Sequence, residues 1–515
     1  MGLLLCVAAL VAGCTVGPSE RPPVAVRGEN MPPLPSPAAP APPPPPLPEP
    51  DPASGTLEFR ACTGGRAATD VAVPPDRALR VECEQVSVEA DPGQPGLGRT
   101  RLGLLRVGLA DAPADRPPLL VVGDSTAEPA AVRALTLATQ VPLGVLQRYT
   151  LVGLDRRGAG IDDLRCGPAT ARNAFVNIDP GGNGSLPELN ALLEQARSVV
   201  QDCYLVHSGA LSGYRTASTA ADVELVRTGL GVAHLSALGV GDGAAALSLW
   251  ARAHPQSVAR LVLDSPPNPT LDEPDAAEAR ATAAEAAFDA FAAACTAGPD
   301  CPLGADPRAV VGSFVQRLRR QPLASTDGRR LTAGMIVSVL LAELGEPAAW
   351  PGLATAIGTA QGGDPSLVLG RVAALLADGG GFDVTLATAC NDVQRRLTPA
   401  EVSELTRRWH DPYPLFGPTM AQRLLACGPW PTTSTSPPPD PGTALPPVLV
   451  IGTARDPRGP LDGSRRVAGT TPGALFLSWQ GAGTGAYPRT PCVTGVVNAL
   501  LVNGTTPVDG TLCPP

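Results

Sequence analysis

The 515-residue chain contains no lysine, few aromatic residues and only four histidines. All 39 of its basic residues are therefore arginine, and aromatic residues make up 3% of the sequence. The formal net charge of −9 argues against a nucleic-acid partner, because phosphates would be repelled and no basic patch reverses the balance. Beyond the first fourteen residues, no apolar run approaches the roughly 18 residues that a membrane span needs. The hydrophobic content of 44% indicates a globular protein.

The N-terminus is typical of an exported lipoprotein. Residues 1–14 are apolar and end in Val-Ala-Gly-Cys, a lipobox-like sequence in which Cys14 would carry the lipid and anchor the chain to a membrane. No Lys or Arg precedes Cys14, a departure that a start codon placed too far downstream would explain. Proline-rich residues 15–54 predict a semi-rigid tether of about 3 Å per residue. We therefore expect an extracytoplasmic, membrane-anchored or secreted protein of a bacterium with a GC-rich genome.

The cysteines predict disulfides. Cys6 and Cys14 belong to the N-terminal signal, and the remaining ten form an even set in an exported chain. Spacing alone does not fix their connectivity, but sequence neighbours suggest five pairs: Cys62–Cys83, Cys166–Cys203, Cys295–Cys301, Cys390–Cys427 and Cys492–Cys513. Zinc binding is the rival interpretation, but the sequence has no C-x-x-C pair and no nearby Cys/His cluster. We therefore expect no metal and no other cofactor.

Apolar runs alternate with helical stretches from about residue 55, which favours an α/β fold with a mostly parallel sheet and crossover helices. The strands are expected at residues 118–122, 149–154, 234–240, 259–263, 446–451 and 474–479. The pattern turns helical between the fourth and fifth of these, most clearly at 277–294. The sequence therefore predicts a core formed by residues 55–267 and 446–515, with a helical cap, residues 268–445, inserted between the late strands and covering their carboxyl ends.

A tight turn is expected after the strand at 234–240. Gly239 and Gly243 keep the outer positions of a G-x-S-x-G nucleophile elbow, which lifts a serine above the sheet, but Gly241 occupies the central position. Asp242 follows at the start of a helix, where capping the backbone N–H groups is favoured over a role as nucleophile. We hypothesise that its carboxylate occupies the space where a substrate oxyanion would sit.

The positions for a catalytic acid and base lie near the C-terminus. Asp456 is the best candidate for the acid, because triads of this kind run Ser, then Asp or Glu, then His. Thr484 stands where a G-x-G-H-G loop would present the base, and its hydroxyl cannot serve as one. All four histidines precede Asp456 and are given no role: His207, His234, His254 and His410. We interpret Asp456 as a relic or a structural carboxylate.

In this order, the segments resemble the secreted α/β-hydrolases of the tripeptidyl aminopeptidase type, including their TAP-like C-terminal region. The resemblance covers about residues 62–513. Further segments that carry it are Asp-Arg-Arg-Gly-Ala-Gly at 155–160, residues 261–264, 287–291, 301–303 and 388–392, and the ending at 497–513. The resemblance implies an α/β-hydrolase fold. It also implies that the family members similar to this chain are exported serine exopeptidases or related hydrolases. Carried over by position, the nucleophile falls on Gly241, the acid on Asp456 and the base on Thr484.

The resemblance also implies a glycine-rich oxyanion loop after the third strand, where this chain reads Gly123-Asp124-Ser125-Thr126. Three of four catalytic elements therefore depart together. Losing the nucleophile or base typically costs about 10⁶ in turnover. We interpret the chain as a pseudoenzyme that binds a peptide, a small ligand or a protein partner at the cell envelope. The alternatives are an active hydrolase or exopeptidase using non-standard groups, and a purely structural envelope protein.

Overall fold

The computed structural model describes residues 46–62, 71–113, 115–125, 129–179, 181, 184–377, 381–432 and 445–515. The expected signal, the lipidation site Cys14, most of the tether and Thr126 lie outside these residues. The part from Pro46 onward forms one compact unit. It includes the last residues of the expected tether, since Asp51 accepts a hydrogen bond from the backbone N–H of His234 at 2.7 Å.

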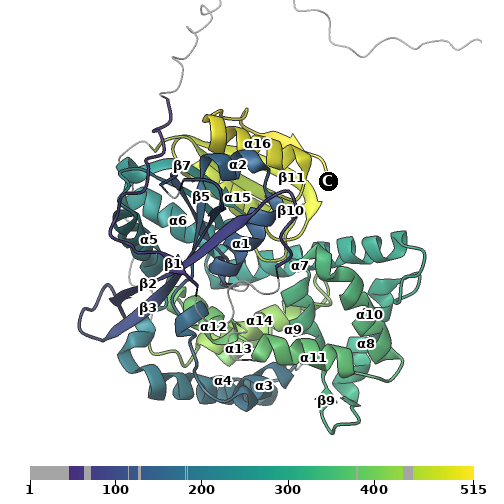
Figure 1. Ribbon diagram of the computed structural model, residues 1–515. Coiled ribbons are helices and arrows are strands. Elements are labelled where there is room, and N and C mark those ends of the chain that lie inside the picture. Colours follow the sequence, from purple (N-terminus) through teal and green to yellow (C-terminus); the bar gives the residue numbers. More distant parts are fainter. Residues whose placement is uncertain are drawn as a thin grey trace, which may run out of the picture. The chain divides into compact units, whose positions relative to one another are not determined.

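The core is a ten-stranded sheet in the order β1-β2-β3-β5-β4-β6-β7-β10-β11-β12 (Figure 1). Its strands are β1 Arg60–Ala61, β2 Leu79–Glu89, β3 Arg99–Leu109, β4 Pro118–Val122, β5 Thr150–Leu154, β6 Leu235–Val240, β7 Val258–Asp264, β10 Val448–Arg455, β11 Ala474–Ala482 and β12 Thr511–Cys513. β1, β2 and β3 pair antiparallel with their neighbours, and all pairs from β5 to β12 are parallel. The expected mostly parallel α/β sheet is confirmed.

Helices cover both faces of this sheet, which is why the central strands are buried along their whole length. They are α1 Ala130–Gln140, α2 Leu143–Arg148, α5 Thr216–Leu230, α6 Asp242–Ala253, α15 Leu461–Thr470 and α16 Pro491–Asn503. Successive strand residues point to opposite faces. In β4, Leu119 and Val121 belong to an apolar cluster with residues of α1, α2 and α16, whereas Leu120 and Val122 pack with residues of α5, α6 and α15.

The chain between β7 and β10 forms the helical cap, which Figure 1 shows gathered to one side of the sheet. Its helices are α7 Glu273–Ala297, α8 Pro307–Arg320, α9 Ala333–Glu343, α10 Trp350–Gln361, α11 Ser366–Leu376, α12 Phe382–Asp392, α13 Pro399–His410 and α14 Gly417–Arg423, with a small hairpin of β8 Leu323–Ala324 and β9 Arg330–Leu331. Phe288, Phe314, Trp350 and Phe416 fill an apolar core inside the cap. The cap is therefore a folded layer with its own packing.

Two helices that precede β6 also pack on the cap: α3 Ala169–Asn177 and α4 Leu186–His207. Leu189 and Leu192 of α4 share an apolar cluster with Ala277 and Trp409 of the cap. The layer over the sheet therefore draws on residues placed in the core by the sequence pattern as well as on residues 268–445. Among the described residues, no helix is long and apolar enough to cross a membrane.

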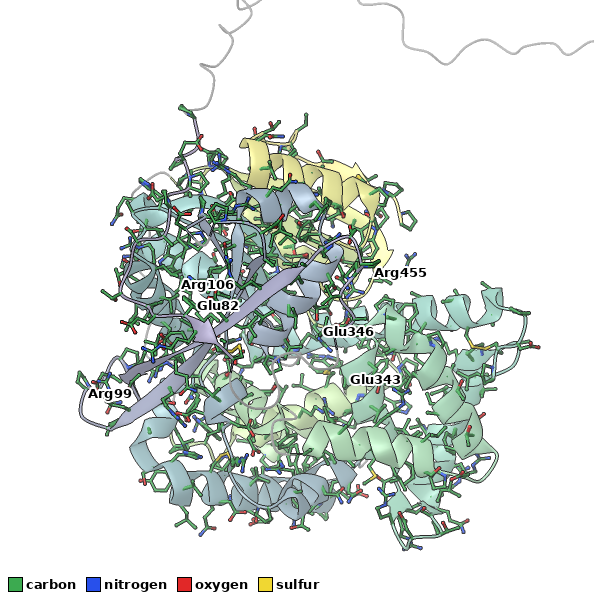
Figure 2. The ribbon with its side chains drawn as sticks, viewed as in Figure 1. Glu82, Arg99, Arg106, Glu343, Glu346 and Arg455 are labelled. Atoms are coloured by element: carbon green, nitrogen blue, oxygen red, sulfur yellow. A yellow bond between two sulfur atoms is a disulfide. The ribbon has the colours of Figure 1, made fainter. Side chains whose placement is uncertain are left out.

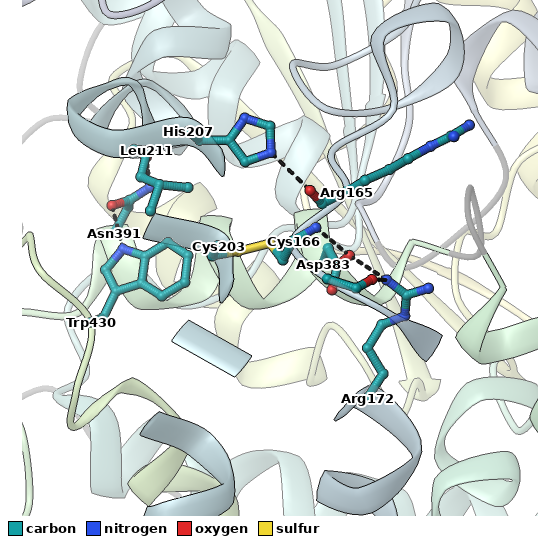
Figure 3. Close-up of a disulfide and its surroundings, with 10 residues drawn as sticks. Arg165, Cys166, Arg172, Cys203, His207, Leu211, Asp383, Asn391 and Trp430 are labelled. Carbon is teal, nitrogen blue, oxygen red and sulfur yellow. Dashed lines mark hydrogen bonds and ion pairs between the residues drawn. A yellow bond between two sulfur atoms is a disulfide. The ribbon is translucent and has the colours of Figure 1, made fainter. Parts of the chain in front are cut away.

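All five expected disulfides are confirmed: Cys62–Cys83, Cys166–Cys203, Cys295–Cys301, Cys390–Cys427 and Cys492–Cys513. Figure 3 shows the second of these, which joins the segment after β5 to α4, beside a contact between that segment and the cap. The Asp383 carboxylate on α12 accepts hydrogen bonds from the backbone N–H of Cys166 at 3.0 Å and from Arg172 at 2.8 Å. The segment that follows β5 is thereby fixed against the cap.

Candidate functional site

The elbow lies between β6 and α6, where the sequence pattern placed it. Gly241 adopts φ 59° and ψ −127°, a backbone conformation that L-residues with a side chain rarely take. Gly243 is the second residue of α6, and the carbonyl oxygen of Gly123 is so close that a Cβ on Gly243 would lie 2.5 Å from it. Gly239, near the end of β6, packs closely against the same turn. The turn is therefore that of a nucleophile elbow, with no side chain at its apex.

The carboxylate of Asp124 fills the space above that apex. A Cβ placed on Gly241 would lie 1.9 Å from Oδ2 of Asp124, and the backbone N–H of Asp242 donates a hydrogen bond to the same oxygen at 3.2 Å. In α/β-hydrolases, the N–H of the residue after the nucleophile is one of the oxyanion-hole donors. Asp124 therefore occupies the volume that a nucleophile side chain would need. It also occupies a hydrogen-bond donor that acyl transfer in this fold would use to stabilise the oxyanion.

Our hypothesis that the Asp242 carboxylate occupies the space of a substrate oxyanion stays a prediction, and the structure places this carboxylate against Ser125 of the oxyanion-loop position. It accepts the backbone N–H of Ser125 at 2.9 Å and the Ser125 hydroxyl, and it forms an ion pair with Arg156. In the part of the chain that the structure describes, no N–H group of α6 donates to this carboxylate, which corrects the capping role that we expected for Asp242. Burial raises the pKa of Asp242, while Arg156 opposes this shift and the charge of Asp124 adds to it. Asp242 therefore joins the oxyanion-loop position to the arginine of the segment after β5.

The structure brings the acid and base positions together. Asp456 follows β10 and is 1% exposed. Its Oδ1 accepts hydrogen bonds from the Thr484 hydroxyl at 2.7 Å and from the backbone N–H groups of Arg458 at 2.9 Å and Gly459 at 3.0 Å. Burial raises the pKa of Asp456 to about 6, against the effect of these hydrogen bonds. The threonine hydroxyl thus makes the contact that an imidazole N–H would make in a triad.

A turn of the cap closes over Thr484. The backbone N–H of Thr484 donates to the carbonyl oxygen of Gly345 at 2.8 Å, and a Cβ on Gly345 would lie 2.8 Å from the Thr484 hydroxyl. Arg489 pairs with Glu346 at 3.0 Å, and Arg458 donates to the carbonyl oxygen of Ala342 at 2.6 Å. Figure 2 shows Glu346 at the margin between cap and core. The end of α9 is therefore fastened over the base position.

A second buried carboxylate supports the same loop, and the sequence reasoning gave it no role. Asp264 ends β7, is fully buried, and accepts the backbone N–H groups of Ala486 at 2.8 Å and Tyr487 at 2.9 Å. Its carbonyl oxygen accepts the N–H of Gly241 at 2.9 Å. Burial raises the pKa of Asp264. The sequence signal that could have identified Asp264 is an acidic residue at the carboxyl end of a buried strand. In the structure, Asp264 joins the loop of the base position to the elbow.

The four histidines all have contacts away from Asp456. Their partners are the Arg165 carbonyl oxygen for His207 (Figure 3), Asp51 for His234, Glu224 for His254 and Asp411 for His410. Across the described ranges, no group of three or more His, Cys, Asp or Glu side chains is arranged to hold a metal ion.

A small recess opens beside the elbow. It is lined by Asp124, Ser125, Arg156, Asp163 and Gly381, among others, and holds about 30 Å³. A buried water needs on the order of 10–15 Å³ measured in this way, so the recess accommodates about two water molecules. It is too small for a peptide.

Comparisons with known proteins agree with this geometry. The sheet order, the elbow after β6 and the acid after β10 define the class as the α/β-hydrolase fold. Residues 413–513 match the family model described as TAP-like protein. Together with the relatives given next, this match supports the similarity to TAP-like α/β-hydrolases that the sequence motifs predicted.

Three relatives are similar along most of their length. Serine protease Hip1 of Mycobacterium tuberculosis is 27% identical over 466 residues, which covers 84% of this chain and 87% of that protein. Carboxylesterase B of the same species is 27% identical over 461 residues, with 84% and 86% covered. Tripeptidyl aminopeptidase of Streptomyces lividans is 24% identical over 479 residues, with 88% of each chain covered. The chain is therefore related to serine peptidases and other hydrolases.

The raised pKa of Asp456 predicts a pH-dependent stability. Because the folded-state pKa of about 6 exceeds the ordinary value of 3.8, Asp456 contributes stability that is fully present below pH 4 and is lost as pH rises through 6. The isosteric variant Asp456→Asn lacks this pH-dependent contribution to stability, because its amide does not titrate. We expect the free energy of unfolding of Asp456→Asn to gain about 3 kcal/mol relative to the wild type between pH 3 and pH 7. Denaturant titrations at several pH values measure this difference, and a difference that stays constant with pH would contradict it.

Proposed function

We propose that the chain is a non-catalytic relative of the TAP-like serine peptidases that binds a ligand at the cell envelope. The observation that carries the proposal is the position of Asp124. Its carboxylate lies where a nucleophile side chain on residue 241 would lie, and it accepts the backbone N–H of Asp242. A substrate carbonyl would therefore find neither a nucleophile nor a free donor at that N–H.

The base position supports the same conclusion. Thr484 is already hydrogen-bonded to Asp456 and lies under the turn at Gly345, so no group there can remove a proton from a nucleophile. The residual turnover of an enzyme without a triad, about 10³ to 10⁴ above water, comes from substrate binding and the oxyanion hole. Here one donor of that hole is taken by Asp124. We propose that the chain has therefore lost both the catalytic base and a complete oxyanion hole, so that ordinary triad hydrolysis does not occur.

A peptide is the ligand class that we favour, because relatives of this chain are named serine protease and tripeptidyl aminopeptidase. The cap keeps a defined shape without catalysis, since its own apolar core and two disulfides hold it: Cys295–Cys301 and Cys390–Cys427. The recess beside the elbow is too small for a peptide, so we place the main contacts of the ligand farther beneath the cap.

Restoring the triad tests this proposal, and the structure decides which variant to use. Gly241→Ser with Thr484→His alone would leave Asp124 in the space that the serine needs. We expect no hydrolysis of aminoacyl, tripeptidyl and short ester substrates by the wild type or by that double variant. We expect measurable turnover once Asp124→Gly is added. The matched control carries Gly241→Ala in place of Gly241→Ser and should be inactive, since it lacks only the nucleophilic hydroxyl.

Hydrolysis of any of these substrates by the wild type would overturn the proposal if the activity co-purifies with the protein and is retained by the single variant Asp124→Gly. It would favour the alternative of an active hydrolase that uses non-standard catalytic groups. Inactivity of the wild type together with activity of the triple variant would show that the scaffold still positions a substrate.

We further propose that the protein is held at the membrane through Cys14, which lies outside the described residues. The lipobox-like sequence at its position and the proline-rich residues after it support this assignment. We expect the wild type to fractionate with membranes when expressed in a bacterial host, and Cys14→Ala to move to the soluble extracytoplasmic fraction. Equal fractionation of the two proteins would contradict lipidation at Cys14.

A further inference from the structure

A group of arginines lies at the end of α8 and in the hairpin of β8 and β9. Residues 317–330 contain five arginines and a single acidic residue, Asp327, in a chain whose net charge is −9. Arg319 pairs with Asp179 at 2.9 Å, and the other four arginines are exposed. We call these four the basic surface: Arg317, Arg320, Arg329 and Arg330. Figure 1 shows β9 in a loop that projects from the cap on the side away from the sheet.

Helix α8 directs its arginines to the solvent. Its buried residues from Val311 to Leu318 recur at spacings of three and four positions and belong to the apolar core of the cap. The opposite face is exposed and carries no acidic side chain, since it consists of Ser313, Gln316, Arg317 and Arg320. Residues three positions apart on a helix are neighbours, so Arg317 and Arg320 lie side by side.

The hairpin brings a further arginine to the same area. Its register places Ala324 of β8 opposite Arg330 of β9. Leu331, the next residue, is fully buried, and because successive side chains of a strand alternate, Arg330 points to the solvent. Strand β8 begins at Leu323, three residues after Arg320, and three residues span at most about 11 Å. The arginines of α8 and β9 therefore form one region of positive charge.

Most of this charge has no partner of opposite sign within the protein. Across the described residues, Arg320 and Arg330 form no ion pair and no side-chain hydrogen bond, and Arg317 makes only a cation–π contact, at 4.8 Å. Arg329 pairs with Asp327 at 2.6 Å. Cations in the last turn of a helix also favour the negative end of its dipole, but this effect does not extend to Arg330 on a strand. Three arginine charges are therefore available to an anionic partner.

The chain that precedes the folded unit is long enough for this surface to reach a membrane. About 30 residues separate Cys14, the proposed lipidation site, from Pro46, where the folded unit begins. At roughly 3 Å per residue they extend to about 90 Å at most. A compact unit of this length is roughly 60 Å across. The length of the tether therefore leaves open which face of the protein meets the bilayer, and the distribution of surface charge decides it.

We infer that the basic surface docks the cap on a bilayer that contains anionic phospholipids. Guanidinium groups bind phosphate oxygens through paired, charge-assisted hydrogen bonds, and basic residues close to an anionic bilayer strengthen binding to it. The rest of the protein has an excess of acidic residues, so the same bilayer repels it and the contact orients the cap toward the membrane. The inference rests on the proposed location at the membrane and not on the loss of catalysis.

Sedimentation with lipid vesicles tests the inference on the unlipidated full chain, Cys14→Ala. At low salt we expect it to bind vesicles of equal parts phosphatidylglycerol and phosphatidylcholine, and not vesicles of phosphatidylcholine alone. Binding should weaken steeply with salt, since the Debye length falls from about 30 Å at 0.01 M to about 8 Å at 0.15 M. Each basic residue close to the bilayer strengthens binding roughly fivefold, so adding Arg317→Gln, Arg320→Gln and Arg330→Gln together should weaken it about 100-fold.

A matched control removes three arginines from helices of the core. It carries Arg252→Gln on α6 with Arg465→Gln and Arg466→Gln on α15, and so has the same net charge as the cap variant. We expect the control to bind anionic vesicles within about twofold of the parent protein, because its arginines lie outside the basic surface. Substitutions of this kind scarcely change stability, so both triple variants should melt close to the parent temperature.

Absence of binding to anionic vesicles would overturn the inference, and so would an equal loss of binding in the two triple variants. Binding of soluble polyphosphate that depends on the three arginines, without binding of vesicles, would assign the basic surface to an anionic polymer instead. A cap variant that melts well below the control would give the arginines a structural role and count against docking. If Cys14 proves to be unmodified while the protein still binds anionic vesicles, the proposed lipidation fails and the docking inference stands.

Discussion

The backbone of Gly241 is the constraint on which the rest of the site depends. With φ 59° and no side chain, this residue lets the segment after β4 approach until Asp124 hydrogen-bonds the next N–H. The approach in turn excludes any larger residue, since a Cβ on Gly241 would lie 1.9 Å from the carboxylate. The absence of a side chain at residue 241 and the position of Asp124 are therefore parts of one structural feature.

The other end of the triad follows the same logic. Thr484 is smaller than histidine, and the turn at Gly345 approaches it closely enough for a backbone hydrogen bond. Asp456 has a structural role that does not require a base. Its carboxylate accepts hydrogen bonds from the turn at 458–459 and from Thr484, and so holds the two loops together. A retained acid in this chain is thus explained by hydrogen bonding, as the interpretation of Asp456 as a structural carboxylate anticipated.

Local patterns predicted much of the fold, because buried parallel strands are continuous apolar runs and neighbouring cysteines form the disulfides. They missed β2 and β3, a long antiparallel pair in which arginine and glutamate interrupt the apolar pattern, as in the exposed pair of Arg99 and Glu89. The sequence located the elbow but not its occupant. Asp124 and Asp242 meet across 118 residues, a contact set by the sheet order rather than by any local signal.

The central claim is that no nucleophile operates in this fold, and reaction with a serine-directed phosphonate followed by intact-mass measurement tests it most directly. The account predicts that the wild-type mass stays unchanged, because the apex of the elbow is Gly241 and Asp124 covers it. A stoichiometric adduct that maps to a single serine would contradict the account, since it would place an activated hydroxyl elsewhere beneath the cap.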